Sequence, residues 1–431
     1  LVAAVEVPLI GANAWPFRPP SVHAHGILGP LVRGAHERFD LGVVRHPAVL
    51  AVVLVAVVAL AGWRAASWSP RLLGAVCVAV VVLVTVPAVL LQVGLRDATA
   101  PWFHVNDSTY QIELAGRLVR HGHTPYGHDY QGSGLERFYT RNGTVPPPSE
   151  HRQVALSHFA YFPGAALTAA AWGVLPSPLD DYRLFVLLAT LGCFAAVLAF
   201  PGPISWRLAV GSALAASPPL VRGAWFGTAD APSLLCLLLA FALLARRRPV
   251  WGSALLAAAI LLKQFALVAL PFFALMLLAQ RLPRPTLTRA GAVFGGILLA
   301  GFIPFLAAGP GAVWRDTITY GTGTYRILGY GLSALLLKVG VIDDRYGSYP
   351  FGILVLVVWL PVTLWLLWNQ RRSGSDWEGA AGFAISMLTL LFVARTFQTS
   401  YLIWPLTGLA MAVVLAAPER DQRFADRGSS P

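Results

Sequence analysis

Charged side chains are scarce in this sequence. Asp, Glu, Lys and Arg make up 12% of the 431 residues, about half of the roughly 25% that is usual in soluble domains. Because so little charge leaves too little polar surface to face water, a soluble globular domain is excluded. The mean hydropathy is +0.64, and the apolar residues form long continuous blocks such as 72–95. A block of about 20 apolar residues crosses the ~30 Å hydrocarbon core as a helix, so the sequence predicts an all-α polytopic membrane protein.

Cysteine and lysine are rarer still. The cysteines Cys77, Cys193 and Cys236 all lie in apolar blocks and lack metal-ligand spacing, so we expect neither a disulfide framework nor a cysteine metal site. The only lysines are Lys263 and Lys338, so the formal net charge of +12 comes from arginines. These arginines lie mostly in short connections between apolar blocks, where topology and lipid phosphates explain them. We therefore expect membrane lipids as partners and no nucleic acid.

The apolar blocks predict about eleven spanning helices in a single domain, residues 46–417. The expected spans lie near 46–66, 72–94, 159–176, 183–200, 206–221, 230–245, 250–279, 287–307, 350–369, 379–396 and 402–417. Residues 1–45 form a weakly patterned N-terminal segment. Residues 418–431 carry several arginines, which predicts a cytoplasmic tail.

Two polar insertions interrupt the apolar blocks, at about 96–156 and 308–350. The second contains a short apolar stretch, 327–339, which we expect to be interfacial or re-entrant. When spans are counted back from a cytoplasmic tail, both insertions fall on the extracytoplasmic face of the membrane.

The same count puts Arg246, Arg247 and Arg248 outside, against the tendency of arginine to lie inside. Either these arginines bind lipid phosphate, or 250–279 is a hairpin broken at Lys263–Gln264. Each arm of that hairpin would be only about 21 Å long, short of a full crossing, so we favour a single span. The count also places Asp230 and Arg222 on the cytoplasmic side, where a structural ion pair is expected.

The first insertion contains an expected amphipathic helix on the membrane surface. Ser108 and Gln111 have the spacing of a helix capping box. The helix then shows apolar residues on one face and ends near Gly122; the apolar residues are Ile112, Ala115, Leu118 and Val119. Asp107 precedes this helix, where the helix dipole favours negative charge and a carboxylate can accept a proton from a sugar hydroxyl. The alternative is that Asp107 is only a helix cap.

This stretch resembles the GT-C glycosyltransferases. It is most similar to glycosyltransferase family 87, the bacterial polyprenyl-phosphomannose-dependent mannosyltransferases. The matching pattern is an aspartate, a tyrosine three residues on, G-x-x-P-Y-G, an aromatic-proline helix start and an embedded lysine: Asp107, Tyr110, Gly122, Pro125, Tyr126, Gly127, Tyr161, Pro163, Lys263 and Pro271. The resemblance covers about 100–405. It implies a GT-C-like fold and an acidic catalytic base in the first outer loop, which carries over to Asp107 alone.

Other charged and aromatic residues complete the expected site. We assign the donor phosphate to Lys263 and Arg395, because a charge inside a membrane usually marks a functional or paired site. Arg326, in the second outer loop, is a third expected phosphate-binding residue. Snorkelling of Lys263 and interfacial anchoring by Arg395 remain alternatives. The expected substrate-binding residues are His104, Tyr110, Tyr126, Asp129, Tyr130, Tyr161, Gln398 and Tyr401. The second insertion, with Asp316, Tyr320, Tyr325, Arg326 and Tyr330, is expected to close over the substrate.

The expected activity is inverting transfer of a sugar from a polyprenyl-phosphate donor to a cell-envelope glycolipid or glycan. The resemblance implies mannose as the first choice of sugar and arabinose as the next, and it implies a bacterial plasma membrane with the active site on the extracytoplasmic side. No cofactor is expected beyond the lipid-linked donor. The histidines of the first insertion match no standard metal site, although a divalent metal is not excluded. The alternative class is a transporter or lipid flippase, which predicts repeats and broken helices around a midplane site.

Overall fold

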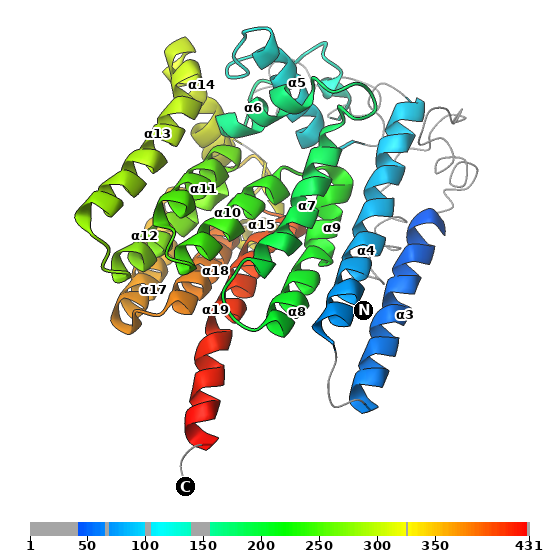
Figure 1. Ribbon diagram of the computed structural model, residues 1–431. Helices are drawn as coiled ribbons and strands as arrows, with labels where there is room; N and C mark the ends of the chain where they lie inside the picture. Colours follow the sequence, from blue (N-terminus) through cyan, green and yellow to red (C-terminus); the bar gives the residue numbers. More distant parts are fainter. Residues whose placement is uncertain (1–41, 65–68, 100–104, 139–155, 325, 429–431) are drawn as a thin grey trace.

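The computed structural model describes residues 42–64, 69–99, 105–138, 156–324 and 326–428. This part of the chain is mostly helical, and its helices pack into one bundle (Figure 1). Its only strands are β1 (Leu328–Gly329) and β2 (Thr396–Phe397), which form a short parallel pair. The prediction of an all-α fold is therefore confirmed.

Several helices have the length and composition of membrane spans. Five are long and apolar enough in the described chain: Pro70–Gly94, Arg284–Ala308, Phe351–Ser373, Asp376–Val393 and Thr399–Ala417. Shorter apolar helices occupy His46–Val57, Tyr182–Leu198, Asp230–Ala245, Pro249–Leu262 and Gln264–Ala279. The expected number of about eleven spans stays a prediction.

The N-terminal helices α3 (Gly42–Arg64) and α4 (Pro70–Thr99) pack side by side at one edge of the bundle (Figure 1). The buried face of α4 includes Val81, Val84 and Ala88. This face packs against α7 (Tyr182–Leu198) and α8 (Ile204–Ala215).

Helices α5 (Asp107–Arg120) and α6 (Pro163–Trp172) lie at the end of the bundle opposite the C-terminus (Figure 1). They pack closely, because a Cβ on Gly116 would come within 2.7 Å of the backbone of Ala169. The expected span at 159–176 is wrong: α6 has 10 residues, about 15 Å, and cannot cross a membrane. The 3-10 helix η1 (Leu135–Phe138) packs against α5.

Helix α9 (Pro218–Phe226) follows α8 after a short break and ends beside α5. The hydroxyl of Thr109 donates to the backbone carbonyls of Phe226 and Gly227. Helix α10 (Asp230–Ala245) therefore starts at the α5 end. It runs away from that end and delivers Arg246, Arg247 and Arg248 to the opposite end.

The segment 250–279 is a hairpin. Helix α11 (Pro249–Leu262) ends at Lys263, whose backbone is extended, and the chain returns through the 3-10 helix η3 (Gln264–Ala269) and α12 (Leu270–Ala279). At the turn, Gln264 Nε2 donates to Ala160 O at 2.9 Å. At the far end, Gln280 Nε2 donates to Leu244 O at 2.6 Å.

This hairpin corrects the prediction of a single span. The hairpin crosses the bundle twice where one crossing was expected, and α6 does not cross where a crossing was expected. The two errors therefore cancel in the number of spans. The arginines after α10 then lie with the α12–α13 connection, at the end away from α5, and their conflict with the positive-inside tendency disappears.

The remaining chain returns to the α5 end twice. Helix α13 (Arg284–Ala308) leads there to α14 (Pro310–Trp314) and the π-helix η4 (Arg315–Thr324). The expected interfacial stretch contains the short helix α15 (Leu332–Lys338). The elements that follow are α16 (Phe351–Leu354), the π-helix η5 (Val355–Trp359), α17 (Leu360–Ser373), α18 (Asp376–Val393), the 3-10 helix η6 (Thr399–Leu402) and α19 (Ile403–Gly428).

Candidate active site

Asp107 is the first residue of α5, and the cap of this helix is Asn106. The side-chain oxygen of Asn106 accepts from Ser108 N at 2.9 Å and from Ser108 Oγ at 2.7 Å. The expected cap, Ser108, therefore lies inside the first turn. Asp107 Oδ1 also accepts from Ser108 N at 2.8 Å. A half-buried carboxylate is thus held at the positive end of the α5 dipole.

Two side chains in the first turns of α5 hold it against the bundle. The Thr109 hydroxyl donates to the carbonyls of Phe226 and Gly227, as described above. Gln111 Nε2 donates to the backbone oxygen of His158 at 2.8 Å. Gly227, beside Thr109, has a φ of +77°, and a Cβ there would collide with Arg183 and Thr109. Only glycine fits this junction.

A buried ion pair lies at the hairpin turn. Lys263 Nζ is 2.8 Å from Asp230 Oδ1, and Trp404 Nε1 donates to the same oxygen at 2.7 Å. Lys263 is 7% exposed and Asp230 3%. The structure therefore corrects two expectations: Asp230 lies at the α5 end, and its partner is Lys263 rather than Arg222. Lys263 is also paired inside the bundle, not snorkelling outwards.

Aromatic rings surround the same ammonium. Lys263 Nζ lies 5.7 Å from the ring centroid of Tyr161, 5.4 Å from that of Phe265 and 5.6 Å from that of Tyr401. Ring faces attract a cation at such distances. The structure therefore brings together three of the predicted site residues, Lys263, Tyr161 and Tyr401.

This lysine cluster and Asp107 belong to one region. Helix α9 packs against η6, which carries Tyr401. The junction at Gly227 contacts Thr109, two residues after Asp107, and lies three residues before Asp230. The α5 N-terminus, the start of α10 and the hairpin turn thus converge at one end of the bundle.

The predicted tyrosines of the first insertion donate hydrogen bonds from their hydroxyls to backbone carbonyl oxygens. Tyr110 donates to Ser133 O at 2.8 Å, Tyr126 to Tyr161 O at 2.8 Å and Tyr130 to Pro125 O at 2.9 Å. Burial raises the pKa of both Tyr126 and Tyr130. These contacts shape the insertion around α5, and the Tyr126 bond positions Tyr161 beside Lys263.

The two polar insertions meet at a buried aspartate. Asp316 is 0% exposed, and its oxygens lie 3.0 Å from His158 Nδ1 and 2.8 Å from the backbone N of Gly127. The His158 ring stacks on Tyr320 with centroids 4.4 Å apart. The second insertion is therefore held against the first by Asp316. The sequence placed both insertions on one face of the membrane but did not predict this contact.

The other predicted residues frame the second insertion. Arg395 is 3% exposed and donates from Nη1 to Gly347 O at 3.1 Å, and its burial lowers its pKa. Arg326 is half-buried, and its carbonyl accepts from Thr396 across the strand pair. Gln398 precedes η6. Asp129 is exposed and accepts from Gln131 N at 3.0 Å.

Two predicted residues, His104 and Tyr325, lie outside the described residues. Within the described chain, no group of three or more His, Cys, Asp or Glu side chains has an arrangement that holds a metal ion. Sequence reasoning missed that Asp230, Phe265 and Trp404 belong to the cluster around Lys263. Asp230 carried a usable signal, because an acid that opens an apolar helix is costly unless paired.

Comparison with known proteins adds one finding. The model of glycosyltransferase family 87 matches residues 159–395, more than half of the chain. This range includes Tyr161, Asp230, the hairpin turn at Lys263 and the second insertion. It begins after α5 and therefore does not include Asp107. No curated protein and no solved structure shows a significant match.

Proposed function

Because the chain belongs to glycosyltransferase family 87 and is a membrane glycosyltransferase, we propose that it transfers a sugar from a polyprenyl-phosphate donor to a cell-envelope glycolipid or glycan, with Asp107 as the general base. Mannose is the proposed sugar, and the extracytoplasmic side of a bacterial plasma membrane is the proposed side of the reaction. The observation that carries the proposal is the convergence of Asp107 and the Lys263 cluster at one end of the bundle.

The proposed chemistry is a single displacement with inversion. Asp107 removes the proton from an acceptor hydroxyl, and the resulting oxygen attacks the anomeric carbon. The bond between that carbon and the phosphate oxygen breaks, and polyprenyl phosphate leaves with the electron pair. A dianionic leaving group needs cationic stabilisation more than it needs a proton, and we assign this role to Lys263, assisted by Arg395 and Arg326.

Lys263 can donate hydrogen bonds to the donor phosphate while it keeps its ion pair with Asp230. An ammonium has three N–H donors, and Asp230 takes one of them at 2.8 Å. The surrounding rings keep water away without competing for the other donors. The pair also keeps the empty site close to neutral, so the cation does not have to be stabilised alone in a region of low dielectric.

The test is Asp107→Asn in purified protein supplied with polyprenyl-phosphate sugar and an envelope lipid extract. The change keeps the size of the side chain and its bond to Ser108 N but removes the base. We expect transfer to fall by 10²-fold or more, with the unfolding curve unchanged. Asp343→Asn, at an exposed carboxylate of the second insertion, is the matched control. Transfer by Asp107→Asn at the wild-type rate would refute the assignment.

A further inference from the structure

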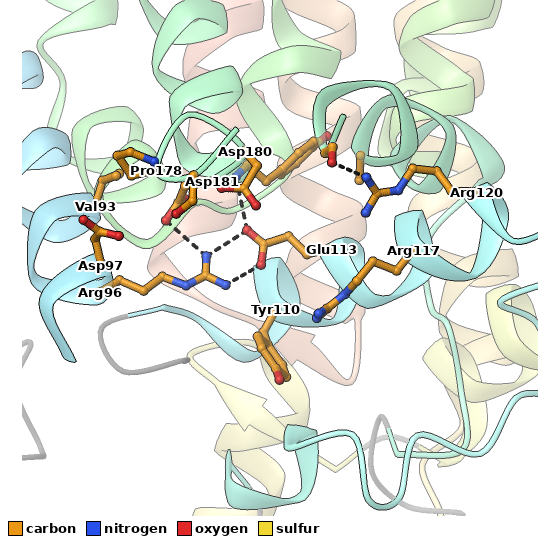
Figure 2. A pocket seen from close by; sticks show the side chains of 14 residues that line it. Val93, Arg96, Asp97, Tyr110, Glu113, Arg117, Arg120, Pro178, Asp180 and Asp181 are labelled. Atoms are coloured by element: carbon orange, nitrogen blue, oxygen red, sulfur yellow. Dashed lines mark hydrogen bonds and ion pairs between the residues drawn. The ribbon is translucent and has the colours of Figure 1, made fainter. Parts of the chain in front are cut away.

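A second polar site lies beside α5, on the side that faces α4 and α7. It is a cleft of about 250 Å³ bounded by α4, α5, α6 and the connection before α7. We call it the acid–arginine cleft and define it by Arg96, Asp97, Glu113, Arg117, Asp180 and Asp181 (Figure 2). None of these residues takes part in the chemistry proposed above.

The floor of the cleft is an internally neutralised network. Arg96 lies between Glu113 and Asp181, at 2.5 Å and 3.1 Å (Figure 2). Asp181 is also 2.6 Å from Arg183, which is 0% exposed. This network joins α4, α5 and α7, so its carboxylates are already occupied. Any ligand must be recognised mainly by the lining residues that do not belong to this network.

Three other residues of the cleft lie outside this network and can contact a ligand. Arg117 and Asp180 are exposed and Asp97 is half-buried, and these three form no ion pair within the described residues. Partial burial, followed by the nearby charge of Glu113, raises the pKa of Asp180. The Asp180 and Asp97 carboxyl oxygens can accept hydrogen bonds from hydroxyl groups, and the Arg117 guanidinium can donate them.

The charges in the cleft select against ions. Three arginines line it, Arg96, Arg117 and Arg120, together with four acids, Asp97, Glu113, Asp180 and Asp181. An anion such as phosphate would meet the acids, and a metal ion would meet the arginines. A neutral molecule with many hydroxyls meets neither penalty, because each hydroxyl both donates to carboxylates and accepts from guanidinium groups.

The position of the cleft relates it to Asp107. Tyr110 also lines the cleft, three residues after Asp107 on α5. At 1.5 Å and 100° per residue, Tyr110 lies about 4.5 Å along the helix from Asp107 and about 60° around it, and Arg117 lies about 15 Å along it. The cleft therefore lies along α5 from Asp107, at a distance that the sugar units next to a reacting one can span.

We propose that the acid–arginine cleft binds the sugar units of the acceptor that lie beyond the reacting one, so that the acceptor is an oligosaccharide carrier rather than a single sugar. This proposal rests on the function proposed above. Its test measures binding without the donor, so that it does not depend on transfer.

The experiment uses the purified full chain in lipid nanodiscs and isothermal titration calorimetry. The probes are neutral trisaccharides of mannose, glucose, galactose and arabinose, each compared with its monosaccharide. We expect at least one trisaccharide to bind about tenfold more tightly than its monosaccharide, since one hydrogen bond to a charged group contributes that much. Arg117→Gln/Asp180→Asn should remove this advantage, and Arg371→Gln, an exposed arginine at the opposite end, should not.

The outcomes separate the two proposals. If no trisaccharide of the panel binds better than its monosaccharide, or if the double variant binds like wild type, the cleft is not an acceptor site, whatever the result for Asp107→Asn. If inorganic phosphate displaces the trisaccharide, the cleft is an anion site and the proposal is also wrong. If binding depends on the cleft but Asp107→Asn still transfers sugar, the cleft proposal stands and the assignment of the base falls.

Discussion

The ion pair between Lys263 and Asp230 makes the sharpest prediction about this protein. Both side chains are almost completely buried, and Trp404 donates to the same aspartate. Removing either charge leaves the other buried without its partner. Lys263→Met and Asp230→Asn should therefore each lower the free energy of unfolding by about 3–5 kcal/mol.

The double variant should behave differently from the sum of its parts. In Lys263→Met/Asp230→Asn no buried charge remains, and the Asn oxygen can still accept from Trp404. Neutral replacement of a buried ion pair is often without cost, so we expect a loss of less than about 2 kcal/mol. The coupling energy between the two changes should then be at least about 4 kcal/mol.

The measurement is equilibrium unfolding by SDS in mixed micelles, monitored by tryptophan fluorescence. Lys338→Met is the matched control, because Lys338 is the only other lysine and is exposed; its effect should stay within about 0.5 kcal/mol. Transfer activity is measured in parallel. We expect it to be lost in all three Lys263 and Asp230 variants, so the double variant separates stability from function.

Two results would contradict this reasoning. Additive losses in the double variant would show that the two charges do not interact. Full transfer activity in a stable double variant would show that the pair is structural and that the phosphate of the donor is bound elsewhere.

The packing and the charges make two further predictions. A Cβ on Gly164 would lie 2.6 Å from the backbone carbon of Leu261, so Gly164→Ala should lower the free energy of unfolding by about 1–3 kcal/mol. A Cβ on Gly291 would have nothing within 4 Å, so Gly291→Ala should raise the free energy of unfolding by about 0.5–1 kcal/mol through α13. Unfolding in SDS measures both changes. Although burial opposes it, Arg183 and Arg96 hold the pKa of Asp181 well below its ordinary value. This stabilisation is present above the unfolded-state pKa of about 3.9 and is lost as the pH falls through the lower folded-state value, so unfolding measured from pH 7 downwards should become easier below about pH 4 in wild type. Asp181→Asn should be about 3 kcal/mol less stable at pH 7 and should lack that part of the pH dependence, and an unchanged pH profile would contradict the assignment.

The sequence predicted what depends on composition and local pattern. Low charge and continuous apolar blocks indicated a helical membrane protein, and period and turn residues indicated the helix at α5. The cap of that helix was misplaced by two residues, because Asn106 and Ser108 are both good caps and only the observed hydrogen bonds decide between them.

The errors came from features that depend on tertiary contacts. The apolar block 250–279 has a suitable length for one tilted span, and only Lys263 marks its turn. The block 159–176 is as apolar as a span, but α6 occupies only part of it and packs along α5. The partnership of Lys263 with Asp230 requires α10 and α11 to lie side by side, which no local pattern encodes.

The short central helices have a consequence for where the charged pair sits. Helix α11 has 14 residues, about 21 Å, whereas the neighbouring α13 has 25. If α11 starts near one boundary of a ~30 Å hydrocarbon layer, its turn stops several ångströms short of the other. Lys263 and Asp230 would then lie below the level of the lipid headgroups, at a depth where solvent screens little and an ammonium attracts a phosphate much more strongly than it does in water.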